Sequence, residues 1–326
     1  MKVAQLVGPK RFMVFDSETP TAADGECLVR LDSVSICGSD IRHGYGPVMP
    51  EEEYPLPLGR PCHECAGTVV ESRTDEFREG QRVIVIPTLE MGGLSEYLVS
   101  NPGRMVGLPD HGSLSEWVMC QPTGTVFYAC KRMGNIMGKS VVIMGQGAIG
   151  LSFTMLTARQ GARQVIAVDL LDYRLEYSRK FGATHTINPS KEDLLERVQE
   201  LTGGVGPDVS VEAAGYPDTL DMVFRMIRRF GTVIIFGIQG DDIVPVDTRT
   251  WMDNQPTIIP TTGARSGDPI SQIREIVELR ERGWIDPAQM ITHRKAFDES
   301  SINEAYRMYE NREDNIVKVV MDIDHS

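Results

Sequence analysis

The order of apolar and polar positions divides the chain into a strand-rich first part and a second part in which strands alternate with helices. Up to about residue 120, short runs rich in Val and Ile are bounded by Gly, Pro or Asp, as at residues 26–31, 67–71 and 82–86. This pattern predicts an antiparallel, partly closed β domain. Between residues 113 and 131 the apolar positions recur with a helical period, so a helical segment is expected there.

After Lys139 the rhythm changes to strand alternating with helix. Strands are predicted at residues 141–144, 165–168, 184–187, 208–213 and 232–236, with helices near 149–159, 172–181, 191–201 and 218–229. The alternation predicts right-handed βαβ units, and therefore an α/β domain with a doubly wound parallel sheet and helices on both faces. Ligands bind such a sheet beyond the carboxyl ends of its strands.

The last part of the chain returns to a β pattern. An amphipathic helix is predicted over residues 270–279, a second near 300–309 and a final strand at 316–320. This return predicts that the C-terminus rejoins the first domain. The expected division is therefore residues 1–122, 123–264 and 265–326, with the first and last segments forming one domain.

A glycine-rich turn separates the first strand and the first helix of the alternating part. Gly145, Gly147 and Gly150 have the G-x-G-x-x-G spacing, in which the second glycine lets a pyrophosphate approach the backbone. The next strand ends in Asp169, about twenty residues further on, where an acid hydrogen-bonds the ribose 2′-hydroxyl of NAD and repels the 2′-phosphate of NADP. The pattern predicts an NAD-binding domain, with a helix N-cap or a solvated strand end as the alternative role of Asp169.

Composition narrows the class of protein. With 41% hydrophobic and 24% charged residues in 326, the chain has the make-up of a soluble globular protein of two domains. A formal net charge of −13 argues against nucleic-acid binding, which needs clustered Lys and Arg. No run approaches the roughly 18 apolar residues of a membrane span, and the first segment breaks at Gly8-Pro9 before a signal-peptide core can form. We expect a cytoplasmic protein with neither nucleic-acid nor membrane partners.

Two short segments carry residue types that bind metals. They are Cys37-Gly38-Ser39-Asp40 and His63-Glu64-Cys65. A thiolate and an imidazole are good zinc ligands, and a catalytic zinc needs only about three protein ligands. Each segment alone also fits a buried core cysteine or a structural histidine. In a chain of this length without a secretion signal, the cysteines are expected to be thiols or ligands rather than a disulfide framework.

Taken in order, the motifs resemble those of the zinc-dependent medium-chain alcohol dehydrogenases, in the polyol, sugar and threonine dehydrogenase branch. The motifs are Cys-Gly-Ser-Asp at 37–40, His-Glu-x-x-Gly at 63–67, Gly-Gly-x-x-Glu-Tyr at 92–97, the glycine turn at 145–150, Ile-Thr-His at 291–293 and Ile-Val-Lys-Val-Val at 316–320. The resemblance covers nearly the whole chain. It implies a GroES-like, β-rich catalytic domain in two pieces around a Rossmann domain, with a zinc ion and NAD as cofactors.

The resemblance also implies roles for individual residues. Cys37 and His63 would bind the zinc, with Glu64 beside it or intermittently on it. Ser39 would pass the proton of the substrate hydroxyl towards solvent. Asp40 would hydrogen-bond the His63 ring and fix its tautomer, unless it is simply a turn residue. The implied cofactor contacts are Gly145, Gly147, Ala148, Ile149, Gly150, Asp169, Arg174 and Lys318.

The remaining zinc ligand departs from the family pattern. Polyol-type members have Glu-Pro where this chain has Gln121-Pro122, preceded by Cys120. The neutral carbonyl oxygen of Gln121 is a weaker ligand than a carboxylate, whereas Cys120 is chemically better but one residue out of register. We expect Gln121 near the metal, directly or through water. Cys120 as the ligand, or a structural role for both, are the alternatives.

Two further departures concern the proton relay and the number of zinc ions. Relatives often carry His two residues after the Asp, but here Arg42 stands there and His43 follows. His43 is then either a relay residue or a surface loop residue, and Arg42 could meet an anionic group of cofactor or substrate.

Because no cysteine lies between Val83 and Gly92, the lobe that holds a structural zinc in many relatives is missing. One zinc per subunit is therefore expected.

The implied function is hydride transfer between NAD and a secondary alcohol or its ketone, with the alcohol of polyol, sugar or amino-alcohol type, in a homodimer or homotetramer. One alternative is a zinc-free, NADPH-dependent quinone or enone reductase of the same superfamily. Such reductases lack the ligands Cys37 and His63 and usually have a basic or small residue in place of Asp169, so these three residues argue against it. The other is a non-catalytic nucleotide-binding protein of this fold, which the Gln121 substitution keeps open.

Overall fold

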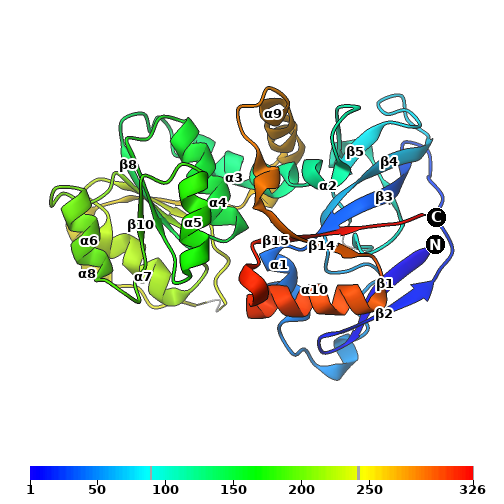
Figure 1. Cartoon of the computed structure of the whole chain (residues 1–326), viewed down its shortest axis with the longest axis horizontal. Coiled ribbons are helices and arrows are strands. Elements are labelled where there is room, and N and C mark those ends of the chain that lie inside the picture. Colours follow the sequence, from blue (N-terminus) through cyan, green and yellow to red (C-terminus); the bar gives the residue numbers. More distant parts are fainter. Residues whose placement is uncertain (89, 241–242, 326) are drawn as a thin grey trace. The chain divides into compact units, whose positions relative to one another are not determined.

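The computed structural model describes residues 1–88, 90–240 and 243–325, apart from the side chains of His43 and Ala264 (Figure 1). Two compact units make up the chain. Unit 1 comprises residues 1–122 and 273–326, and unit 2 comprises residues 123–272. The first division lies between Pro122 and Thr123. The second falls at residue 273 rather than 265, because helix α9 (Pro269–Glu281) begins in unit 2 and ends in unit 1.

Unit 1 is built on a mixed seven-stranded sheet. Its strands are β3 (Cys27–Ser35), β4 (Glu64–Ser72), β5 (Arg82–Val85), β6 (Tyr97–Ser100), β7 (Met105–Gly107), β14 (Ile291–Ala296) and β15 (Lys318–Asp322). They run in the order β14-β15-β3-β4-β5-β7, and β6 pairs with β3. The last strand lies antiparallel to β3, with Val320 opposite Ser35. The C-terminal segment therefore rejoins the first part of the chain as expected.

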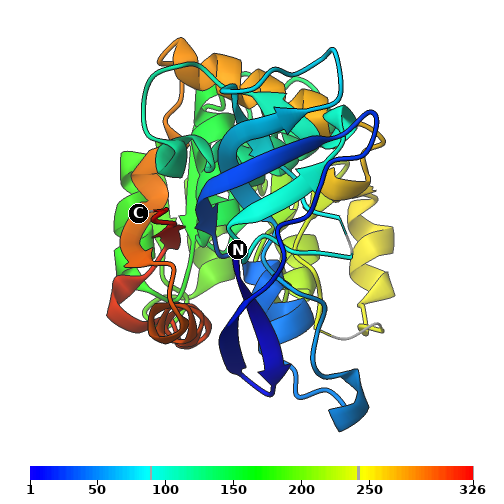
Figure 2. The ribbon, with the colours of Figure 1, turned by 90° about the vertical axis from the view of Figure 1, so that its right-hand side faces the viewer.

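A separate hairpin of β1 (Lys2–Gly8) and β2 (Arg11–Asp16) extends from unit 1, beside the segment around η2 (Glu51–Glu53) (Figure 2). The amide of Leu56 donates to the carbonyl of Leu6 at 3.0 Å, which joins that segment to the hairpin. Helix α10 (Glu299–Asn311) packs on β2, and the buried rings of Phe12 and Tyr306 lie 4.6 Å apart. The hairpin is thereby tied to both pieces of unit 1.

The predicted helical segment at 113–131 is two helices, α2 (Leu114–Trp117) and α3 (Cys120–Arg132). The guanidinium of Arg280, on α9, lies 4.1 Å from the centroid of the Trp117 ring and donates to Glu116 at 2.9 Å. The remaining short helices of unit 1 are α1 (Gly38–Asp40), η1 (Ile41–Tyr45), η2 (Glu51–Glu53), η3 (Pro102–Arg104), η5 (Pro287–Met290) and η6 (Glu313–Asn315).

Unit 2 is a doubly wound parallel sheet, as predicted. Its strands are β8 (Ser140–Met144), β9 (Gln164–Val168), β10 (His185–Ile187), β11 (Val209–Glu212), β12 (Thr232–Ile235) and β13 (Thr257–Pro260). The helices are α4 (Ala148–Arg159), α5 (Asp172–Lys180), α6 (Leu194–Leu201), α7 (Pro217–Met226) and α8 (Thr248–Asn254), with a short turn η4 (Gly263–Arg265). The order β10-β9-β8-β11-β12-β13 reverses direction between β8 and β11. In such sheets a dinucleotide lies beyond the carboxyl ends of the strands at this reversal.

Right-handed crossovers place α4 and α5 on one face of this sheet and α6 and α7 on the other, which agrees with the contacts within each helix pair. Apolar side chains such as Val142, Ile166 and Val233 are fully buried between the layers. Within the described residues, no helix has the length and apolar character needed to cross a membrane.

Candidate active site

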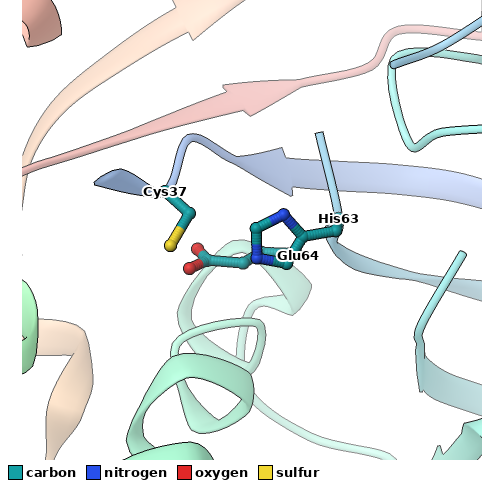
Figure 3. A group of neighbouring side chains, drawn as sticks. All are labelled: Cys37, His63 and Glu64. Atoms are coloured by element: carbon teal, nitrogen blue, oxygen red, sulfur yellow. The ribbon is translucent and has the colours of Figure 1, made fainter. Parts of the chain in front are cut away.

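Three metal-ligating groups lie together in unit 1, and their side chains point towards one another (Figure 3). Cys37 follows β3, and His63 and Glu64 stand where β4 begins. The two strands are antiparallel with Ser35 opposite Glu64, so the register of the sheet brings the three residues to one place. The ligand atoms of the three side chains lie within 4.8 Å of one another. One metal ion can be reached by all three.

Asp40 orients the His63 ring through its Nδ1 atom. Its buried carboxylate lies 2.6 Å from His63 Nδ1 and accepts a hydrogen bond from the amide of Cys37 at 2.9 Å. The expected hydrogen bond between Asp40 and His63 is therefore present, and it leaves Nε2 of the ring for a metal. Burial of the ring lowers the pKa of His63, but the charge of Asp40 and hydrogen bonds to Asp40 and Cys37 more than offset this and raise that pKa well above its usual value.

Lys318 was expected to contact the cofactor, but the structure buries it against a candidate ligand. Its Nζ forms an ion pair with Glu64 Oε2 and donates to the carbonyl of Ile36 at 2.8 Å and to Ser35 Oγ at 3.2 Å. Both charged side chains are at most 1% exposed. Burial alone would lower the pKa of Lys318, but the charge of Glu64 outweighs it and holds that pKa above its usual value. The ammonium group is thus engaged inside unit 1, because β15 is an interior strand of the sheet.

The donor set fits zinc. A thiol, an imidazole and a carboxylate are the ligand types of catalytic zinc sites. Glu64 Oε1 is buried and has no hydrogen-bond partner among the described residues, and the same holds for Oε1 of Gln121, the second residue of α3. Such orphaned oxygens are costly unless a cation or water satisfies them. Burial raises the pKa of Cys120 to about 12, which favours the thiol over a metal-binding thiolate.

Ser39 and His43 are the two candidates for proton transfer to solvent. Ser39 is half-buried in α1, next to Asp40. His43 belongs to η1, but its side chain lies outside the described part of the chain.

The glycine turn of unit 2 has the geometry that a pyrophosphate requires. A Cβ on Gly150 would lie 1.8 Å from the carbonyl oxygen of Gly145, so only glycine allows helix and strand to approach this closely. At Gly147 a Cβ would have only Arg174 Nη1 nearby, at 3.8 Å, so the backbone there is open. Helix α4 starts at Ala148, and the amides of Ala148 and Ile149 in its first turn have no partner within the helix. The turn therefore fits a phosphate group.

Asp169 lies directly after β9, at the same edge of the sheet as the turn. Its carboxylate accepts hydrogen bonds from the amides of Gln146 at 2.7 Å and Leu171 at 2.9 Å, and lies 3.8 Å from Arg174. Each carboxylate oxygen has a second lone pair, so capacity remains for a ribose hydroxyl. The structure thus brings Asp169, Arg174 and the glycine turn together.

Two features of these sites were missed from sequence. One is the ion pair of Lys318 with Glu64, for which no local pattern exists. The other is Glu212, a fully buried carboxylate that ends β11. In the sequence, an acid directly follows the short β-type run Val-Ser-Val, much as Asp169 follows the apolar run of β9, and this pattern could have pointed to Glu212.

Replacing Asp40 with Asn should weaken zinc binding by roughly 10- to 100-fold, since it removes the charge that orients and polarises the His63 ring. Competition with a chelator measures the affinity. Asp32→Asn is a matched control, because Asp32 also accepts a side-chain hydrogen bond, from Thr68 at 2.9 Å, within the same sheet. Equal zinc affinities of the two variants would rule out this role for Asp40.

Comparison with known proteins places both units in one family. Residues 23–129 match the model of the alcohol dehydrogenase GroES-like domain, and residues 148–281 match that of zinc-binding dehydrogenases. The chain is 31% identical over 243 residues to an uncharacterized zinc-type alcohol dehydrogenase-like protein of Haemophilus influenzae, covering 66% of this chain and 70% of that protein. It is 28% identical to a sorbitol dehydrogenase of Bacillus subtilis, over 92% of this chain and 91% of the relative.

Among solved structures, an oxidoreductase/dehydrogenase of unknown specificity from Escherichia coli is similar over 99% of this chain and 100% of its own, with a TM-score of 0.88 and 27% identity. The fold, the ligand cluster and these relatives agree. The chain belongs to the zinc-type medium-chain alcohol dehydrogenase family of oxidoreductases.

Proposed function

We propose that this protein is an NAD-dependent dehydrogenase that interconverts a secondary alcohol of polyol, sugar or amino-alcohol type and its ketone. One zinc ion would be held by Cys37, His63 and Glu64, with Gln121 as a further ligand, directly or through water. The observation that carries the proposal is the convergence of the first three residues within 4.8 Å, with Asp40 behind the histidine. The substrate class rests on the Gln-Pro pair at 121–122 and on the relative named sorbitol dehydrogenase.

When bound, zinc supplies Lewis acidity to the substrate oxygen and the nicotinamide supplies the hydride acceptor. The residues of the chain provide position and proton transfer. Ser39 accepts the proton that leaves the substrate hydroxyl and hands it to solvent, a role that suits its half-buried place beside Asp40. Asp40 keeps the His63 ring in one orientation and one tautomer. In solution we expect a homodimer or homotetramer in the cytoplasm, and light scattering measures the subunit number.

The test is a screen of polyols, sugars and amino alcohols for NADH formation, together with the zinc content of the purified protein. We expect about one zinc per chain and activity with at least one class of secondary alcohol. Less than about half an equivalent of zinc in carefully prepared protein would contradict the metal assignment, because structural and catalytic zinc is held tightly. Reduction of a quinone or enone with NADPH by zinc-free protein would favour the alternative reductase activity.

Replacing Asp169 with Asn should lower the preference for NAD over NADP by about tenfold or more, because the repulsion between the carboxylate and the 2′-phosphate is lost. The ratio of kcat/KM for the two cofactors measures it. Asp172→Asn is the matched control, since Asp172 lies three residues further on, is exposed and pairs with Lys191 at 2.5 Å. If the two variants show the same ratio as the original protein, the 2′-hydroxyl is recognised elsewhere.

A further inference from the structure

The carboxylate of Glu212 holds the loop that follows β11 through hydrogen bonds. It is the last residue of that strand and is fully buried. Its Oε1 accepts hydrogen bonds from the amide of Ala214 at 2.9 Å, the amide of Gly215 at 2.7 Å and Oγ1 of Thr219 at 2.7 Å. Three donors on one oxygen fix the path of the chain from the end of β11 into helix α7.

The other carboxylate oxygen faces the loop that follows β12. Oε2 accepts a hydrogen bond from Gln239 Nε2 at 3.2 Å. It also packs against the backbone of Gly237, where a Cβ would lie only 2.2 Å from it. The carbonyl of Glu212 accepts the amides of Phe236 and Gly237 at 3.0 and 2.9 Å. One residue therefore ties two neighbouring loops together at the carboxyl edge of the sheet.

These two loops flank the place where the sheet changes direction. The first loop packs on the phosphate turn, since a Cβ on Gly145 would lie 2.9 Å from the Cβ of Ala214. The second loop, through Gly237 and Ile238, lines a hollow of about 410 Å³ that is also bordered by Thr261. Glu212 thus stands between the glycine turn and this hollow, all within unit 2.

We propose that Glu212 is a positioning residue for the half of the dinucleotide that carries the nicotinamide. The inference rests on the proposed function, namely that unit 2 binds NAD with its adenosine at Asp169 and its pyrophosphate at Gly147. From there an extended ligand continues past Ala214 towards residues 236–239. Because Glu212 is buried, it acts on this half only through the two loops, by holding them at a fixed separation.

The bond between Glu212 and Gln239 can be broken and rebuilt by exchanging the two side chains. Gln239→Glu places two carboxylates within 3.2 Å of each other and should push the loops apart. We expect NADH binding, measured by calorimetry, to weaken about tenfold or more, the effect of losing a charge-assisted hydrogen bond. Binding of ADP, which lacks the nicotinamide half, should stay within about twofold.

The double variant E212Q/Q239E restores one donor facing one acceptor and the original net charge. The amide introduced at position 212 can donate to the new carboxylate while its oxygen still accepts from the first loop. It should recover NADH binding to within a few-fold of the original protein. This rescue would not follow from a general loss of stability.

Asp208→Asn is the matched control. Asp208 precedes β11 at the opposite edge of the sheet and accepts the amide of Ser140 at 2.8 Å and Arg228 Nε at 2.8 Å. The Asp208→Asn variant should have a lower melting temperature, but its ratio of NADH to ADP affinities should be unchanged. If Gln239→Glu fails to fold, Gln239→Leu cuts the same bond without repulsion and should shift the ratio in the same direction by a smaller factor.

Three results would overturn the proposal. The first is an equal loss of NADH and ADP affinity in Gln239→Glu. The second is a double variant that binds NADH no better than Gln239→Glu does. The third is a ratio of NADH to ADP affinities that is the same in every variant as in the original protein. A starting protein that binds neither ligand would instead overturn dinucleotide binding itself, and the two failures are therefore distinguishable.

Discussion

Replacing Cys37 with Ser should leave a protein that binds NADH but neither retains zinc nor oxidises an alcohol. The variant removes the thiolate, the strongest of the three donors that meet within 4.8 Å. Lewis-acid activation by zinc is worth several kcal/mol, which corresponds to a loss of about a thousandfold or more in kcat. Metal content, NADH affinity and turnover are measured on the same preparation.

The matched control is Cys27→Ser. Cys27 begins the same strand that Cys37 follows, is fully buried and has Ser72 Oγ 3.6 Å from its sulfur. It should bind zinc and turn over substrate as the original protein does. Normal turnover by the Cys37 variant would refute the metal site, whereas loss of NADH binding by both variants would point to misfolding.

Replacing Lys318 with Met should lower the free energy of unfolding of the metal-free protein by about 3–5 kcal/mol, because it leaves the Glu64 carboxylate buried without its counter-ion. The ammonium group also satisfies the carbonyl of Ile36, which would lose its donor. Denaturant unfolding followed by circular dichroism measures the change. The effect should be among the largest of any single substitution in unit 1 that creates no cavity.

Two further variants test the cause. Lys318→Met combined with Glu64→Gln removes both charges and should recover much of the lost free energy, since no uncompensated ion remains. Lys295→Met removes a lysine from an exposed pair with Glu304, at 2.6 Å, and should cost less than about 1 kcal/mol. A cost at Lys318 no greater than that at Lys295 would mean that the buried pair contributes little.

The parallel sheet of unit 2 could be predicted because each of its elements has a local pattern. Predicted strands at 141–144 and 165–168 correspond to β8 and β9, and the helix predicted over 149–159 corresponds to α4. A short run of Val and Ile followed by glycines is sufficient to mark such a unit. Helix α8 and strand β13 were missed, because neither contains a fully buried residue and neither therefore shows a clear apolar face in the sequence.

The candidate site was predictable only in part, because only some of its residues belong to a local sequence pattern. Cys37, His63 and Asp40 belong to short motifs whose chemistry is visible in the sequence. Lys318 does not, because a lysine within Val-Lys-Val-Val looks the same whether it faces solvent, cofactor or a buried acid. Its partner Glu64 lies 254 positions earlier, and only the pairing of β15 with β3 brings that part of the sheet together. Contacts of this range leave no local trace.

The pairing of β15 with β3 also orders events during synthesis of the chain. Unit 2 is a continuous segment, so it can fold once residues 123–272 have left the ribosome, since domains generally fold as units. At that stage unit 1 still lacks its second segment. Cys37 and His63 have been synthesised, but Lys318, the counter-ion of Glu64, is the first residue of β15. Until that strand arrives, the nascent chain presents an unpaired acid and an open edge of β3 at the future metal centre. The candidate metal site can therefore be completed only after β15 has been synthesised.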